Sequence, residues 1–222
     1  VYKRQYQANV VAGPWRAFAR ITASLFISLA GVSLALSYAR FKRKEGGWTL
    51  YKKYLVRGLK LLGWGMIITA VTWIFMGKVV VFFGILHLIG AATILVYPFL
   101  SLRWANLFIG LAIIALGVYL NQLPVSHPWM LLLGLRPRTL FQVDYFPLLP
   151  WFGMVLLGVF AGQSLYPSGK RRFNLPDLIS RPGIKGLVWS GRRSLAIYLV
   201  HQPLLLAFIA LASAVGIVNV SS

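Results

Sequence analysis

Four polar side chains set in apolar surroundings carry most of the chemistry that this sequence offers. His87 lies in the run FFGILHLIG and His201 in SLAIYLVHQP, so hydrophobic residues bracket each imidazole. Asp144 directly precedes the stretch YFPLLPWFG, and Arg20 lies inside the first apolar run. An imidazole can act as a general base or a nucleophile, and a charged group beside it can orient the reactants. We therefore take His87, Asp144 and Arg20 as candidate catalytic residues. The structural alternatives are a charge at a helix N-terminus for Asp144 and a side chain that extends outward to the membrane surface for Arg20.

A second polar group surrounds His201. Tyr198 and Ser194 precede it by three and seven residues, so all three side chains share one helix face, and Pro203 should kink the helix just beyond them. We predict that His201, Tyr198 and Ser194 bind the substrate. Polar residues inside a membrane also join helices, so a single interhelical hydrogen bond is the structural alternative for His201 and for His87.

Basic residues gather beside two of the apolar runs. Lys53 and Arg57 are four residues apart at the start of one run, and Arg192 and Arg193 directly precede another. The N-terminus of a helix beginning at Ser194 would favour a phosphate beside this second pair. We predict that these four basic residues bind the phosphate groups of a cofactor, with anionic lipid headgroups as the alternative ligand.

Metal chemistry finds little support in the sequence. There is no cysteine, and the three histidines and three acidic residues lie in separate segments, without the short spacings of a metal site. The sequence therefore predicts no metal cofactor, no disulfide and no thiolate nucleophile.

The composition indicates the class of protein that must position these groups. Of the 222 residues, 59% are hydrophobic and 12% are charged, with a mean hydropathy of +0.74. A water-soluble fold of this size cannot bury so much apolar surface, which indicates an integral membrane protein. The net charge of +20 lies mainly in loops between apolar runs, where it sets membrane topology, so we expect no nucleic-acid partner.

Six apolar runs are long enough to cross a hydrocarbon core of about 30 Å as helices. We therefore predict an all-α, polytopic transmembrane helical bundle, with residues 15–222 forming a single transmembrane domain. The expected spans are Trp15 to Tyr38, Tyr54 to Met76, Val79 to Leu100, Trp104 to Leu120, Leu148 to Tyr166 and Ser194 to Ile217.

The loop charges predict the orientation of the bundle. Of the 23 Lys and Arg residues, 16 fall in the loops that follow the first, third and fifth expected spans or in the segments beside them. The positive-inside rule places these loops in the cytoplasm. We therefore expect a multi-pass membrane protein with its C-terminus on the outer side.

The first expected span carries a narrow stripe of small and polar residues below Arg20. Ser24, Ser28, Gly31 and Ala35 follow at spacings of three and four. Such a stripe is typical of a seam where two membrane helices pack closely. The alternative is that it lines a path for a substrate or cofactor.

Four segments together resemble a known family. They are FARITASLFISLAGVSLALSYAR (18 to 40), FFGILHLIGAATILVYP (82 to 98), DYFPLLPWFGMVLLGVFAGQSLYP (144 to 167) and GRRSLAIYLVHQPLL (191 to 205). From about Trp15 onward the chain resembles the bacterial membrane family similar to the catalytic domain of heparan-α-glucosaminide N-acetyltransferase. The resemblance implies a transmembrane acyltransferase that takes an acetyl group from cytosolic acetyl-CoA and passes it to a sugar hydroxyl or amine on the far side.

The beginning of the chain departs from the family pattern. The resemblance implies one further N-terminal helix and an acetyl-accepting histidine just outside it, and residues 1 to 15 contain no histidine. We interpret residues 1–14 as an outer-side remnant, whose first five residues, VYKRQ, are the translated end of a sequencing adapter. We therefore expect at least one N-terminal helix to be missing, together with the family's acyl-accepting residue.

Residues and resemblance together predict an acyl-CoA-dependent transmembrane O- or N-acetyltransferase. Its expected partners are the lipid bilayer, acyl-CoA and a sugar or glycan acceptor, and a homodimer is left open. Two alternatives stand beside this prediction. One is a proton-coupled transporter or permease that uses the intramembrane histidines and Asp144 at the midplane, and the other is a non-catalytic membrane subunit.

Overall fold

The structure of the chain is a computed structural model that describes residues 13–44, 46–76, 81–121, 134, 145–173, 182–194, 196–197, 200 and 208. Its chain contacts divide it into two units, residues 1–173 and residues 174–222, which are described separately. The two units have their own helices, and the first contains the packed core.

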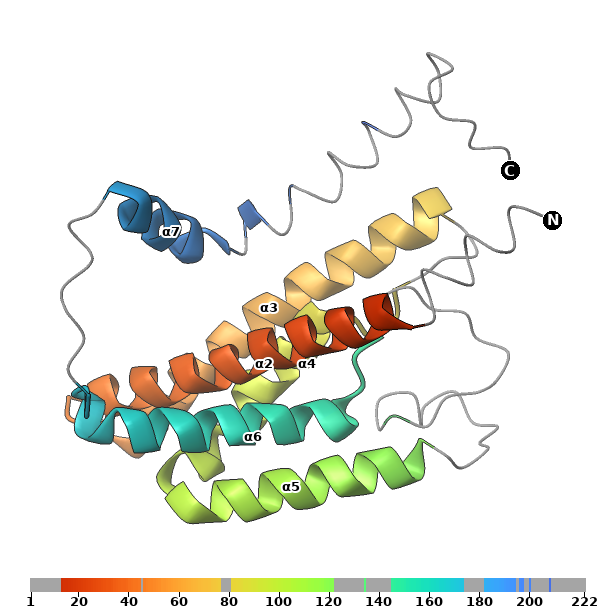
Figure 1. Cartoon of the computed structure of the whole chain (residues 1–222). Helices are drawn as coiled ribbons and strands as arrows, with labels where there is room; N and C mark the ends of the chain where they lie inside the picture. Colours follow the sequence, from red (N-terminus) through yellow and green to blue (C-terminus); the bar gives the residue numbers. More distant parts are fainter. Residues whose placement is uncertain are drawn as a thin grey trace. The chain divides into compact units, whose positions relative to one another are not determined.

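Every regular element in the described part of the chain is helical. Four of these helices are long and apolar enough to cross a membrane, which confirms the predicted helical membrane bundle. The first unit holds α2 (Pro14–Phe41), α3 (Gly47–Met76), α4 (Ile85–Leu95), the 3-10 turn η1 (Tyr97–Ser101), α5 (Arg103–Leu120), α6 (Leu148–Leu165) and the 3-10 turn η3 (Pro167–Gly169), and the second unit holds α7 (Pro182–Arg192). Figure 1 shows their order along the chain.

The expected third span, Val79 to Leu100, is not one continuous helix. Residues 81–84 are non-helical, α4 covers 11 residues, and the chain then turns through η1. Pro98 lies in η1 and has no backbone N–H to continue an α-helix. The prediction that this segment is apolar was right, but the prediction of one continuous helix was wrong. Hydropathy does not indicate where a helix is interrupted.

The expected second span begins earlier than predicted. α3 starts at Gly47 instead of Tyr54 and contains 30 residues, so it is about 45 Å long at 1.5 Å per residue. This exceeds a hydrocarbon core of about 30 Å. Because the extra turns carry Lys52 and Lys53, the helix extends as a basic, solvent-accessible segment beyond the apolar part.

Close backbone packing joins α2 to α6. A Cβ atom added at Gly31 would collide with the Val155 carbonyl oxygen, and one added at Gly158 would collide with the Ser28 carbonyl oxygen. Further along, Gly162 faces Ala35. The stripe of small residues on α2 is therefore a helix-packing seam, as the first of its two interpretations predicted.

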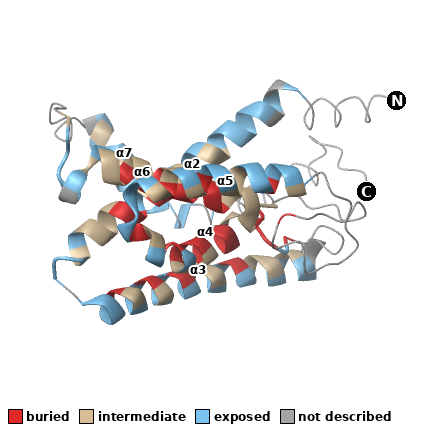
Figure 2. Cartoon of the chain, turned by 90° about the horizontal axis from the view of Figure 1, so that it is seen from below, coloured by how far each residue is buried: buried red, intermediate tan, exposed pale blue. Residues whose placement is uncertain are grey.

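A second seam joins α5 to α6. A Cβ atom at Gly110 would lie 3.0 Å from the Gly153 carbonyl oxygen, and one at Gly117 would lie 2.7 Å from the Pro150 Cα atom. Helix α6 therefore packs against α2 on one side and α5 on another. Figure 2 shows the buried residues concentrated where helices of the first unit meet, while the outer side of α3 is exposed and apolar, as a lipid-facing surface should be.

Candidate functional site

A non-helical segment, residues 81–84, connects to the start of α4 and is held by two threonines of α3. Thr69 Oγ1 donates a hydrogen bond to the Val81 carbonyl oxygen at 2.6 Å. The Val81 N–H donates to Thr72 Oγ1 at 3.2 Å. In apolar surroundings every backbone polar group outside a helix needs such a partner. The two threonine hydroxyl groups therefore replace the backbone hydrogen bonds that a continuous helix would have made.

His87 lies in the first turn of α4, and both of its ring nitrogens have partners. The Gly84 N–H donates to Nδ1 at 3.3 Å, and Nε2 lies 3.4 Å from Thr69 Oγ1. Since Nδ1 accepts a hydrogen bond, the proton of the neutral ring belongs on Nε2 and points to Thr69. The result is a chain of hydrogen bonds from Gly84 through His87 and Thr69 to the Val81 carbonyl group. We call Thr69, Thr72, Val81, Gly84 and His87 the His87 cluster.

The His87 ring is enclosed by its neighbours. Its side chain is 4% exposed, and it packs against the Phe83 ring with centroids 5.6 Å apart. A Cβ atom at Gly65 of α3 would lie 2.9 Å from His87 Cε1, so this ring fits only beside a glycine. The interhelical hydrogen bond proposed as the structural alternative for His87 is present. A catalytic role for His87 stays a prediction.

The depth of His87 follows from its partner on α3. Thr69 lies seven residues before the end of α3, which corresponds to about 10 Å along the helix. An uninterrupted helix over the expected span from Val79 would place His87 eight residues, or about 12 Å, along its length. The depth is instead reached by a non-helical segment that runs beside the last turns of α3.

The beginning of α6 is attached to the same region. The Phe146 N–H donates to the Phe83 carbonyl oxygen at 3.0 Å, and Pro147 precedes the helix in an extended conformation. Leu149 is also non-helical, with φ −99° and ψ 129°, because a residue before proline avoids the α conformation. Asp144 precedes Phe146 by two residues and lies outside the described residues.

Arg20 is exposed on α2, six residues after the helix begins. Within the described part of the chain, no hydrogen bond or ion pair joins Arg20 to His87. The structure thus locates Arg20 and His87 on different helices without bringing them together, and it does not describe Asp144.

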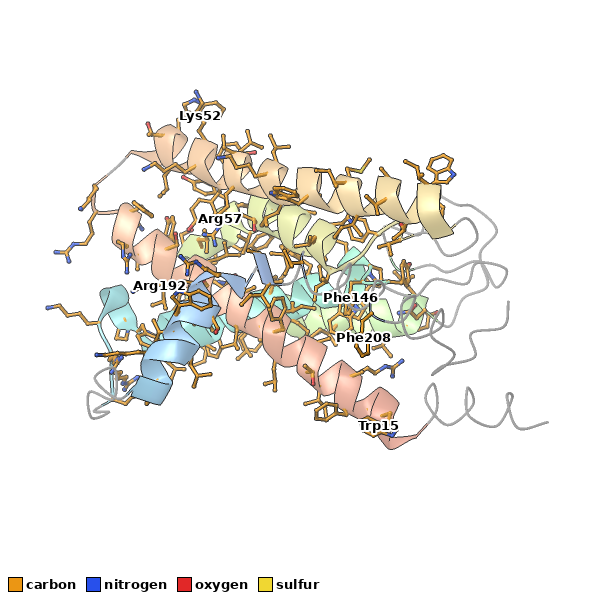
Figure 3. The ribbon with its side chains drawn as sticks, turned by 90° about the horizontal axis from the view of Figure 1, so that it is seen from above. Trp15, Lys52, Arg57, Phe146, Arg192 and Phe208 are labelled. Atoms are coloured by element: carbon orange, nitrogen blue, oxygen red, sulfur yellow. The ribbon has the colours of Figure 1, made fainter. Side chains whose placement is uncertain are left out.

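Lys53 and Arg57 of α3, which we predicted to bind a cofactor, lie at the opposite end of the bundle from the His87 cluster. There the chain passes from α2 to α3, and α5 begins where α6 ends (Figure 1). The Lys53 Nζ atom lies 4.7 Å from the centre of the Phe41 ring, and Arg57 is exposed one turn further along α3 (Figure 3). Basic side chains from several elements therefore share this end.

Sequence reasoning missed a cluster of four tyrosines at this basic end. The Tyr97 ring contacts those of Tyr38, Tyr51 and Tyr54, with centroids 6.3, 5.1 and 5.8 Å apart. Tyr97 Oη donates to the Gly47 carbonyl oxygen at 2.6 Å, which fixes η1 to the start of α3. The available signal was weak: tyrosines near the ends of three expected spans, which also occur as ordinary membrane-interface residues.

A pair of amide side chains at the same end, Asn106 and the half-buried Gln163, was also missed. Asn106 Nδ2 donates to the Phe99 carbonyl oxygen at 2.8 Å, and Gln163 Nε2 donates to the Leu100 carbonyl oxygen at 2.7 Å. Asn106 is fully buried. These bonds satisfy carbonyl groups of η1 and tie this turn to both α5 and α6.

The remaining predicted site residues belong to the second unit. Arg192 is the last residue of α7, and the Arg193 guanidinium lies 4.4 Å from the centre of the Trp189 ring. Ser194 is exposed, whereas Tyr198 and His201 are outside the described residues, as is most of the expected sixth span. Their predicted roles in cofactor and substrate binding stay predictions.

Metal ligands do not cluster in the described part of the chain. No group of three His, Cys, Asp or Glu side chains occurs there, and all three acidic residues of the sequence lie outside it. The predicted absence of a metal therefore stays a prediction.

Apolar helices joined by glycine seams, with a buried polar cluster and a basic, aromatic end, define a helical membrane bundle. The chain matches the protein family described as "Heparan-alpha-glucosaminide N-acetyltransferase, catalytic" over residues 2–203, and it belongs to this family. The family implies a membrane acetyltransferase-like function. No curated protein and no solved structure matches the chain.

Proposed function

We propose that this protein transfers an acetyl group from cytosolic acetyl-CoA to a sugar or glycan acceptor on the outer side of a bacterial inner membrane. The observation that carries the proposal is the family match over residues 2–203. The distribution of side chains supports it, because the first unit has a basic, aromatic end and a buried histidine cluster away from that end.

The basic end is the proposed donor site. Lys53 and Arg57 suit the phosphate groups of CoA, since cationic side chains form charge-assisted hydrogen bonds with phosphate oxygens. The tyrosines around Tyr97 offer aromatic surface for the adenine ring, because bases stack on aromatic side chains. Arg192 and Arg193 of the second unit are also proposed as cofactor-binding residues.

The His87 cluster is the proposed reaction region. Nε2 makes the longest contact of the cluster, at 3.4 Å, and Thr69 Oγ1 keeps its 2.6 Å bond to Val81 if that contact is lost. The Nε2–H group of His87 can therefore donate its hydrogen bond to a reacting oxygen in place of Thr69 without leaving the threonine unpaired. Asp144 and Arg20 are proposed to orient the reactants, and Ser194, Tyr198 and His201 to bind the acceptor.

Binding of acetyl-CoA to the purified protein in detergent tests this proposal. The control ligand is dephospho-CoA, which lacks the 3′-phosphate. Saturable binding of acetyl-CoA, with weaker binding of the control, is the expected result, because the phosphates contact the basic end. If acetyl-CoA does not bind, the donor site and the acyltransferase function are both wrong.

The buried hydrogen-bond chain is the observation that favours the alternative of a proton-coupled transporter. This chain ends at the Val81 carbonyl group, which accepts a hydrogen bond but does not pass a proton on. The acyltransferase function is therefore the better supported of the two. Proton-driven solute uptake by protein reconstituted in liposomes, without acetyl-CoA, would reverse this choice.

A further inference from the structure

Helix α7 separates its apolar and basic side chains onto different faces. Ile184, Leu187 and Val188 are spaced by three and four residues, so they fall within an arc of about 100°. Lys185, Trp189 and Arg192, spaced by four and seven residues, occupy another arc, centred roughly 120° away. Leu187 is 73% exposed, whereas Ile184 and Val188 are half-buried, so this apolar face is open in part. Figure 3 shows α7 with Arg192 near its end.

The sequence of α7 is a poor helix former by itself. It has 11 residues, fewer than the 12 to 15 that an isolated helix needs, roughly, to be even marginally stable in water. It also contains Gly183, Gly186 and Gly191, and each glycine costs about 1 kcal/mol relative to alanine in a helix. An apolar environment outside the helix, either lipid or protein, must therefore contribute to the stability of this helix.

The glycines of α7 differ from those of the helix seams. A Cβ atom at Gly183, Gly186 or Gly191 would meet no atom within 4 Å, whereas one at Gly31 or Gly158 would collide with a neighbouring backbone. Close helix packing therefore does not explain the glycines of α7 in the described residues.

The position of α7 in the chain and its charge indicate which apolar phase is involved. Sixteen residues separate Pro182 from Leu165, the end of a helix long and apolar enough to cross a membrane. From Lys170 to Arg193 the chain has seven basic residues and one acidic residue, Asp177. Basic segments beside a membrane gain about 1 kcal/mol per Lys or Arg from anionic lipid. Tryptophan, here Trp189 beneath Arg193, is typical of the headgroup level.

We propose that α7 is an interfacial helix that lies along an anionic phospholipid leaflet. Ile184, Leu187 and Val188 enter the boundary between headgroups and acyl chains, and Lys185 extends to the lipid phosphates. This arrangement holds Arg192 and Arg193 at the membrane surface. It does not depend on the acetyltransferase function.

The absence of cysteine from the sequence makes the test direct, because a single added cysteine carries the only spin label. The full chain is labelled at I184C or L187C, on the apolar face, and at G186C or S190C, on other faces, as matched controls. Each variant is reconstituted in vesicles of phosphatidylglycerol and phosphatidylcholine, or of phosphatidylcholine alone. The measurement is the accessibility of the label to oxygen and to a water-soluble nickel complex.

In phosphatidylglycerol vesicles, the ratio of oxygen to nickel accessibility should be several-fold higher at residues 184 and 187 than at 186 and 190. The difference should shrink in phosphatidylcholine alone, and added inorganic phosphate should not restore it. Equal nickel accessibility at all four positions would show a helix in water. Low accessibility of 184 and 187 to both reagents would show that protein covers this face. If inorganic phosphate restored the difference in accessibility, free anions would be the ligand. Any of these three results overturns the proposal.

Discussion

At the scale of single residues, Thr69 joins groups that are distant in the sequence. Its hydroxyl donates to the Val81 carbonyl oxygen at 2.6 Å and lies 3.4 Å from His87 Nε2 and 3.3 Å from the Gly65 carbonyl oxygen. One threonine therefore determines how residues 81–84 pass α3 and how the His87 ring is oriented. Both His87 and Thr69 can be tested separately, because each has a matched control.

Thr69→Val should destabilise the protein by about 1 to 2 kcal/mol, because it leaves the Val81 carbonyl oxygen and His87 Nε2 without this partner. Thr69→Ser should keep most of the stability. Thr22→Val is the control, since the Thr22 hydroxyl bonds to the Phe18 carbonyl group of its own helix. The measurement is the thermal unfolding temperature of all three variants in the same detergent. Equal unfolding temperatures for Thr69→Val and Thr22→Val would contradict the role assigned to Thr69.

His87→Gln should lower the rate of acetyl transfer by about 10²-fold to 10⁴-fold, the usual contribution of a general acid or base, while the protein still inserts in the membrane. The control is Thr93→Val, also buried in α4, whose hydroxyl bonds to the Ile89 carbonyl group. Initial rates with acetyl-CoA, together with an insertion assay, distinguish the two variants. Near-normal turnover of His87→Gln would leave His87 with a structural role alone.

At the scale of elements, the glycine seams set the distances between helices. Gly31 and Gly158 let α2 and α6 approach until their backbones touch, and Gly110 and Gly153 do the same for α5 and α6. Membrane helices have little hydrophobic driving force for association, so such contacts contribute much of the packing energy. Helix α6 is central because it takes part in both seams.

Gly158→Ala should destabilise the bundle by about 1 to 3 kcal/mol, because the added methyl group collides with the Ser28 carbonyl oxygen and separates α2 from α6. Gly63→Ala provides the opposite control. A Cβ atom at Gly63 meets no atom within 4 Å, so this change should raise stability by up to about 1 kcal/mol through helix propensity. Thermal unfolding of both variants tests the seam, and a neutral Gly158→Ala would disprove it.

At the scale of the whole molecule, charge is distributed unevenly along the helices of the first unit. The end with Lys53 and Arg57 also holds the tyrosine cluster, whereas the His87 cluster lies far along α3 from it. A protein that accepts an anionic cofactor on one side and a different substrate on the other would have this polarity. The donor site can be tested by changing charges at this end.

Lys53→Gln combined with Arg57→Gln should weaken acetyl-CoA binding by roughly twofold to thirtyfold, the effect of losing two exposed charge contacts. The loss should be larger at low salt, because salt screens charge contacts. Lys52→Gln is the control, since Lys52 is exposed at the same end but projects from another face of α3. Titration at two salt concentrations measures the effect. A loss that does not change with salt would indicate altered folding instead of a lost charge contact.

The same experiment extends to the second unit. Neutralising Arg192 and Arg193 should also weaken acetyl-CoA binding more at low salt than at high salt, if both residues contact the phosphates. Unchanged affinity would show that Arg192 and Arg193 are not part of the donor site. The basic residues of the first unit would then be the remaining candidates for binding acetyl-CoA.

The sequence by itself determined the class of protein and the approximate position of most helices. Length and hydropathy are local properties, so the runs at Trp15, Trp104 and Leu148 matched α2, α5 and α6 to within a few residues. The seam on α2 was also readable, because the spacing of Ser28, Gly31 and Ala35 is a property of one helix.

The tertiary structure decided what depends on partners from other helices. Thr69 meets His87 from 18 residues away, and Tyr97 meets Gly47 from 50 residues away, so no local pattern indicates either contact. The non-helical segment before α4 also depends on partners from another helix. A non-helical backbone at that depth is stable because Thr69, Thr72 and His87 satisfy its polar groups, and this compensation exists only once α3 and α4 have packed together.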